Sequence, residues 1–150
     1  MRVYLVIIDE TEEALVALRF AARRAAKTDG RIHLVALVPR QQFSAFAAVQ
    51  ATIEEEARGR AETLLTAAAG NLLAEGAKMP EISVRQGEGV KVVRDYLTEH
   101  PEVSALVLGA ADGGPGPLVV HFTGAAAGKL PCPVFVVPGS LSEDDIERLS

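Results

Sequence analysis

Five short apolar segments recur along the chain, and each is separated from the next by a segment with helical periodicity. The apolar segments cover residues 3–8, 32–38, 82–86, 103–108 and 134–137. Runs of this length, rich in Val and Ile and bounded by Gly, Pro or Asp, are typical of β-strands. Strands that alternate with helices form parallel βαβ units with right-handed crossovers. The alternation therefore predicts an α/β, Rossmann-like fold, in which helices cover both faces of a single open, parallel five-stranded sheet.

The composition of each strand indicates its place in this sheet. Residues 3–8 and 103–108 are mainly apolar, as in strands that are covered on both faces, whereas residues 82–86 (ISVRQ) alternate as an edge strand does. This places the strands in the order 3-2-1-4-5. The chain then reverses direction between strands 1 and 4, and the crevice at such a reversal is the usual ligand site of an open α/β sheet.

A glycine-rich loop follows the fourth strand at the predicted crevice. Residues 109–117 read GAADGGPGP, a helix-like segment follows them, and Asp9 ends the neighbouring first strand. Glycine allows close backbone approach, and a strand that enters a helix through such a loop often holds a phosphate group. In the alternative interpretation, the glycines and prolines only turn the chain. Both the strand order and the loop composition point to the same crevice.

The remaining boundaries follow from capping residues. Asp9, Thr11 and Glu12 are candidate start residues for the first helix. A long second helix is expected over residues 49–76, and Phe43 and Phe46 either begin it or cover the sheet edge.

The domain organisation is expected to be simple. Residues 1–138 are predicted to form one domain, and residues 139–150 a short acidic C-terminal tail that is helical.

Charge and composition exclude several classes of function. The net charge of −5 argues against nucleic acid as a partner, and no apolar run is long enough to span a membrane. A single cysteine, Cys132, fits a reducing compartment, so a cytoplasmic location is expected. His33, His100 and His121 lie far apart in the sequence, and no metal site is expected from their spacing.

Five motifs in the expected order resemble the universal stress protein A family over residues 2–138. They are VYLVIIDETEEALVALRFA, IHLVALVP, VRQGEG, LVLGAADGG and LPCPVFVVP. The resemblance implies a small binding or signalling module of the stress response, with no defined catalytic reaction. It also implies a homodimer that forms through the last strand, at Val134, Phe135, Val136 and Val137. Some members of the family bind ATP and others do not.

The nucleotide-binding branch of this family is similar in carrying an aspartate after strand 1 and the pattern G-x2-G-x9-G-[ST] after strand 4. Asp9 fits the aspartate and Gly109 fits the first glycine, but Asp112 takes the place of the second. The final pair falls on Phe122-Thr123 or, counted back from the last strand, on Val120-His121. These departures predict a degenerate nucleotide pocket.

In this interpretation, Asp112 would repel phosphate, and Phe122 or Val120 would fill the space that a glycine leaves open. The alternative is that ATP or AMP, with Mg²⁺, binds through an altered glycine loop. The candidate nucleotide-binding residues are Asp9, Val38, Gly109, Asp112, Gly113, Gly114, Gly116, His121 and Thr123. No catalytic residue is expected, because the sequence contains no complete motif for a nucleophile or for a phosphate-binding lysine.

Overall fold

The protein, for which we analysed a computed structural model, is described over residues 1–38 and 47–150. Its elements are β1 (Val3–Ile8), α1 (Glu12–Thr28), β2 (Arg31–Val38), α2 (Ala47–Ala74), β3 (Glu81–Gln86), α3 (Gly89–Glu99), β4 (Ala105–Ala110), α4 (Pro117–Thr123), a 3-10 turn (Ala127–Lys129), β5 (Val134–Pro138) and α5 (Glu143–Leu149). Phe43 and Phe46, which the sequence assigns either to the start of the second helix or to the sheet edge, lie outside the described residues.

The strands form one five-stranded sheet in the order β3-β2-β1-β4-β5, with parallel pairing throughout. The predicted fold class and strand order are therefore confirmed. β1 lies at the centre, where Tyr4 pairs with Ile32 of β2 on one side and with Ala105 of β4 on the other.

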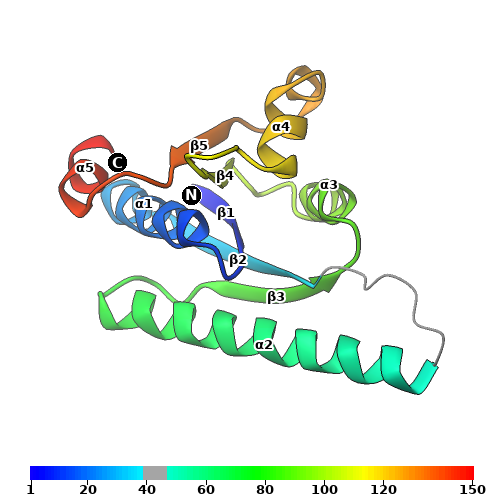
Figure 1. Cartoon of the computed structure of the whole chain (residues 1–150). Coiled ribbons are helices and arrows are strands. Elements are labelled where there is room, and N and C mark those ends of the chain that lie inside the picture. The colour runs from blue at the N-terminus through cyan, green and yellow to red at the C-terminus, as the bar shows by residue number, and fades with distance from the viewer. Residues whose placement is uncertain (39–46) are drawn as a thin grey trace.

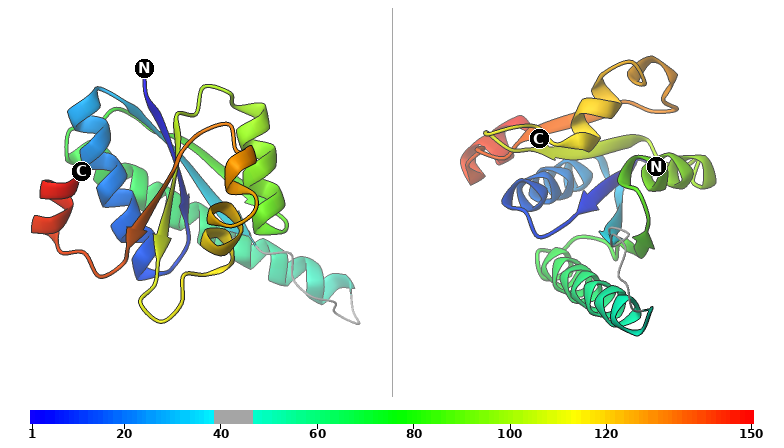
Figure 2. Two further views of the ribbon diagram at one scale, coloured as in Figure 1. Left: turned by 90° about the horizontal axis from the view of Figure 1, so that it is seen from above. Right: turned by 45° about the vertical axis from the view of Figure 1, so that its right-hand side comes forward.

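Alternate side chains of the central strand enter two separate cores, as the period of a strand requires. Tyr4, Val6 and Ile8 pack into the core that α1, α2 and α5 cover. Their neighbours Leu5 and Ile7 pack into the core beneath α3 and α4. Figures 1 and 2 show the two sets of helices on opposite sides of the sheet. All six residues of β1 are buried, which explains why this strand shows no polar alternation.

The two outer strands are more exposed than the central ones. Ile82 on β3 is 46% exposed, and Val136 on β5 is 39% exposed. The predicted position of residues 82–86 at an edge is thus confirmed. β5 forms the opposite edge, so its outer hydrogen-bonding groups face no other strand of the described sheet.

Helices α1 and α2 each carry an apolar side chain near their N-terminal end that is not buried in the core. On α2 the buried positions follow the spacing of one helical face, and they are Ala57, Ala61, Leu65, Ala68, Ala69 and Leu72. Ile53 and Leu15, which the helical periodicity assigns to buried stripes, are each 37% exposed. For Ile53 the reason is that α2 extends past the sheet at its N-terminal end (Figure 1).

The residues after β5 include the short helix α5. Ser142 caps α5 by accepting a hydrogen bond from the Asp145 backbone amide, and the Asp145 carboxylate accepts one in return from the Ser142 backbone amide. Ile146 is buried in the core beneath α1, and Glu147 forms ion pairs with Arg23 and Lys27. The tail thus packs on α1. Among the described helices, none combines the length and the apolar character that crossing a membrane requires.

The first turn of α1 lies directly against the end of β4, and Gly109 makes this contact possible. A Cβ atom at position 109 would lie 2.1 Å from the backbone oxygen of Glu13. No side chain rotation can relieve such a clash, because the obstructing atoms belong to the backbone. The opening glycine of the loop therefore has a packing role.

We expect Gly109→Ala to destabilise the protein by about 3 kcal/mol, because α1 and β4 must separate to admit the methyl group. Gly113→Ala is the matched control, since a Cβ atom there meets no atom within 4 Å. Urea denaturation of the two variants measures the difference. Equal stability of the two would contradict the close contact.

Candidate functional site

A cavity of about 330 Å³ lies at the carboxyl ends of β1 and β4, where the order of the strands reverses. Its walls come from six parts of the chain. They are the ends of β1, β2 and β4, the starts of α1 and α3, and the loop that enters α4, with Ile7, Asp9, Thr11, Glu13, Ala14, Leu37, Glu88, Gly89, Val90, Leu108, Gly109, Pro115, Gly116, Pro117, Leu118 and Val119 as lining residues. The predicted crevice at the switch point is thus present as a cavity.

The loop between β1 and α1 holds Asp9 in place. The Asp9 carboxylate accepts hydrogen bonds from the backbone amide and the hydroxyl of Thr11, the first at 2.8 Å. Thr11 in turn caps α1, because its hydroxyl oxygen accepts a bond from the Ala14 amide. Of the three candidate start residues, Thr11 is the cap. Asp9 is therefore fixed at the mouth of the cavity by the start of the helix.

The N-terminus of α3 also reaches this cavity, but the protein's own carboxylate occupies it. Glu88 caps the helix and accepts hydrogen bonds from the amides of Val90 at 3.0 Å and Lys91 at 2.9 Å. These bonds lower the pKa of Glu88 below its ordinary value, and the bond from the Lys91 amide has the larger effect. Free amides at a helix start are what attract phosphate, and here a carboxylate already takes them.

The start of α4 offers less to an anion than a regular helix start. Gly116 is its N-cap, with a φ of 85° that favours glycine, and Pro117 occupies the first turn. Proline has no amide hydrogen, so one of the donors that a helix start usually presents is missing. The loop therefore approaches the cavity closely while providing few donors.

The charge of the cavity wall is negative. Three of its lining residues are acidic, namely Asp9, Glu13 and Glu88, while none of its described lining residues is Lys, Arg or His. The same described set contains no Ser or Cys that could serve as a nucleophile. The arrangement suits a ligand with hydroxyl groups and an apolar part better than one with several phosphates.

The tip of the glycine loop points away from this cavity. Asp112, Gly113 and Gly114 are exposed, and a short bridge from Ala111 to Gly114 closes the turn that contains them. Asp112 is not among the residues that line the cavity, and its place beside a bound phosphate stays a prediction. The turn carries its side chain into solvent.

The predicted steric obstacles do not lie in the cavity either. Phe122 is fully buried in the core beneath α3 and α4, and Val120 is 61% exposed on the other face of α4. Adjacent residues on a helix point in different directions, so neither register of the glycine motif predicted which side chain faces the cavity.

Three further candidate residues lie near the cavity without lining it. Thr123 donates its hydroxyl to the Val119 carbonyl at 2.6 Å, within its own helix. The Nε2 atom of His121 is buried without a hydrogen-bond partner among the described residues, and His121 lies close enough to Glu88 to contribute to lowering the pKa of that carboxyl. Val38 lines a second cavity, also of about 330 Å³, that shares Asp9 with the first.

Cys132 packs at the edge of the second core and is half-buried. Burial raises the pKa of its thiol above the ordinary value, which keeps the less reactive protonated form at neutral pH. The residue behaves as a small core side chain.

A profile of the universal stress protein family matches residues 1–138. The chain belongs to the universal stress protein family. The predicted resemblance is therefore confirmed, and it extends over almost the same residues. A search of curated proteins found no match.

Solved universal stress proteins share the fold of this one. Universal stress protein UspA from Lactobacillus plantarum is 19% identical, with 91% of this chain and 97% of that chain covered and a TM-score of 0.76. A universal stress protein in complex with cAMP is 19% identical, with 93% and 98% covered and a TM-score of 0.65. A family member from Arabidopsis thaliana with AMP bound is 14% identical, with 96% and 94% covered and a TM-score of 0.65.

Glu13 and Glu88 are the functional candidates that the sequence motifs did not reveal. Glu88 belongs to the segment VRQGEG, where a polar residue follows a strand and precedes an apolar helical stripe. Because all strands of a parallel sheet end at the same edge, that position is close to the crevice. A search for helix caps at that edge would have found it.

Proposed function

We propose that this universal stress protein is a cytoplasmic stress-response module whose crevice binds an adenine nucleotide weakly and disfavours a triphosphate. The observation that carries the proposal is that three acidic residues, Asp9, Glu13 and Glu88, line a cavity at the switch point of the sheet. The complexes of similar proteins with cAMP and AMP support an adenine nucleotide as the ligand class.

Each part of the nucleotide has a matching wall in this proposal. The apolar surfaces at Leu37 and Val38, on either side of the β2 end, suit a purine base. The Asp9 carboxylate can accept hydrogen bonds beyond those from Thr11, which suits ribose hydroxyl groups, since these donate hydrogen bonds. The phosphate would then lie near Gly116, where the chain allows close approach.

The triphosphate is disfavoured for electrostatic reasons. ATP brings more negative charge than AMP to the same three carboxylates, and Mg²⁺ removes only part of that charge. The α3 amides that could compensate are bonded to Glu88 instead. We propose binding without turnover, since the described wall contains no Ser, Cys, His or Lys side chain to act on the ligand.

We expect Mg²⁺-ATP to bind with a dissociation constant of roughly 0.1 mM or weaker, and AMP to bind no more weakly than ATP. Glu88→Gln should strengthen ATP binding about fivefold, because it removes one charge while an amide oxygen can still cap α3. Asp112→Gly is the matched control and should change the affinity less than twofold, since Asp112 is exposed away from the wall.

Isothermal titration of the three proteins distinguishes the cases. If Asp112→Gly strengthened binding and Glu88→Gln did not, the glycine loop would be the obstacle. Micromolar binding of Mg²⁺-ATP by the wild type would overturn the degenerate crevice and favour the alternative, an ATP-binding protein that uses Gly113, Gly114 and Gly116 as its cradle.

We also propose that the protein is a homodimer that pairs through β5, with residues 139–150 attached as a helical tail rather than a separate domain. β5 is an edge strand whose residues Val134, Phe135 and Val136 are partly accessible. An apolar edge strand tends to pair with another edge. Pro133 and Pro138 limit such pairing to a short segment, because proline cannot donate to a ladder.

Val136→Asp should convert the dimer to a monomer, because it places a charge at the centre of the proposed interface. Val120→Asp is the control, since Val120 is an exposed valine on α4 and not part of β5. Sedimentation velocity at micromolar concentration measures the mass of each. A monomeric wild type would contradict the interface, and removal of residues 139–150 should weaken the dimer if the tail also contributes.

A further inference from the structure

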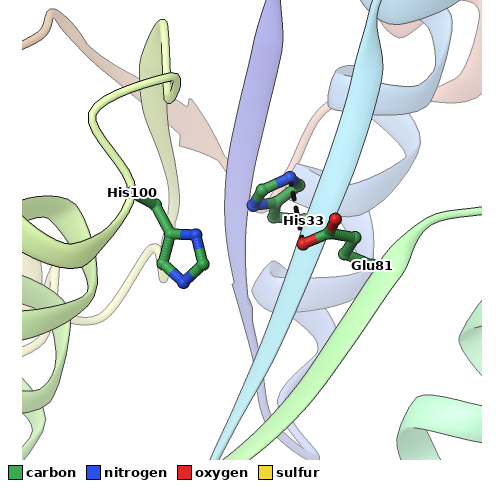
Figure 3. Close-up of side chains that lie close together, drawn as sticks. All are labelled: His33, Glu81 and His100. Carbon is green, nitrogen blue, oxygen red and sulfur yellow. Dashed lines mark ion pairs between the residues drawn. The ribbon is translucent and has the colours of Figure 1, made fainter.

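The amino ends of β2 and β3, opposite the crevice, carry a second group of polar side chains. His33 of β2, Glu81 of β3 and His100 at the end of α3 each present one potential metal-ligand atom, and these atoms lie within 4.8 Å of one another. Figure 3 shows His33 and Glu81 side by side on neighbouring strands, with the His100 ring facing them from the end of α3. His33 and His100 are thus close in space although they are far apart in the sequence.

The spacing of His33 and Glu81 matches two ligands of one metal ion. Nε2 of His33 lies 3.5 Å from Oε2 of Glu81, beyond the usual range of a hydrogen bond. Two ligands that each lie about 2.1 Å from a tetrahedral zinc ion are about 3.4 Å apart. The register that pairs His33 with Glu81 between β2 and β3 sets this distance.

Tyr96 holds the ring of His33 in a way that permits metal binding. Its hydroxyl bonds to Nδ1 of His33 at 2.8 Å in the interior of the protein. A hydroxyl can donate or accept, so the neutral ring can carry its single proton on Nδ1, bonded to the Tyr96 oxygen, and leave Nε2 free to bind a metal. No hydrogen bond to the ring is lost in this tautomer.

The third ligand, His100, is held beside the other two by its neighbours. His100 is only partly buried, its ring stacks on Tyr96 with centroids 4.0 Å apart, and its Nδ1 lies 3.0 Å from Oε1 of Glu102. A carboxylate that bonds a ligand histidine orients its ring and increases its basicity. The Glu81 side chain is also exposed, so both surface ligands can close on a metal without movement of the sheet.

We propose that His33, Glu81 and His100 form a zinc-binding site at the amino edge of the sheet. Two imidazoles and a carboxylate are a common zinc ligand set, and water completes the coordination. Mg²⁺ and Ca²⁺ prefer oxygen ligands and fit this set less well. Bound zinc would join β2, β3 and the end of α3, elements that meet at this edge.

The test uses the full-length protein without an affinity tag and zinc chloride as the probe, in isothermal titration and thermal melting. We expect one equivalent of Zn²⁺ with micromolar affinity, no heat with Mg²⁺, and a rise in melting temperature with Zn²⁺. Glu81→Gln and His100→Gln should each weaken zinc binding at least tenfold and remove the rise. The Glu81 side chain is exposed, so the melting curve of Glu81→Gln without zinc should match the wild type.

His121→Gln and Cys132→Ser are matched controls, because they remove the third histidine and the single cysteine outside the cluster. Both should bind zinc like the wild type. The proposal is overturned if the wild type does not bind Zn²⁺ at submillimolar concentration, if either ligand variant retains full affinity, or if a control variant loses binding. The test is independent of the nucleotide proposal, since the cluster lies at the opposite edge of the sheet.

Discussion

The contact between the first turn of α1 and the end of β4 determines the shape of the crevice. At Gly109 the two backbones lie so close that a Cβ atom would be 2.1 Å from the Glu13 oxygen, and a Cβ atom at Gly139 would also meet Glu13. This packing brings the Asp9–Thr11 turn next to the loop that enters α4. A bulkier residue at either glycine would displace α1 and widen the cavity that its start helps to form.

Electrostatics at helix ends underlies the selectivity that we propose for the crevice. A helix start attracts anions because its first amides lack partners. In this protein Glu88 supplies those partners at α3, and Pro117 removes an amide at α4. The glycine loop thus keeps the close backbone approach of a nucleotide site while its donors for phosphate are reduced. The departure from the family pattern therefore affects the charge and the hydrogen-bond donors of the crevice more than the room it leaves for a ligand.

The polarity of a parallel sheet separates two chemistries in this small protein. The carboxyl ends of the strands carry the acidic crevice around Asp9, and the amino ends carry the imidazole cluster of His33 and His100. The two groups share only the sheet between them. Each lies where helices and strands end, and the elements that carry its side chains are rigid.

The strands, their order, the edge position of β3 and the family could all be predicted from the sequence, because these depend on local periodicity, on motifs and on rules of chain connection. The sequence also placed Asp9 and Gly109 at the crevice. Only the tertiary structure decided that Asp112 points into solvent, that Phe122 is in the core, and that Glu88 closes the start of α3. Those outcomes depend on the direction of individual side chains in turns and short helices, and residue spacing along the chain does not specify that direction.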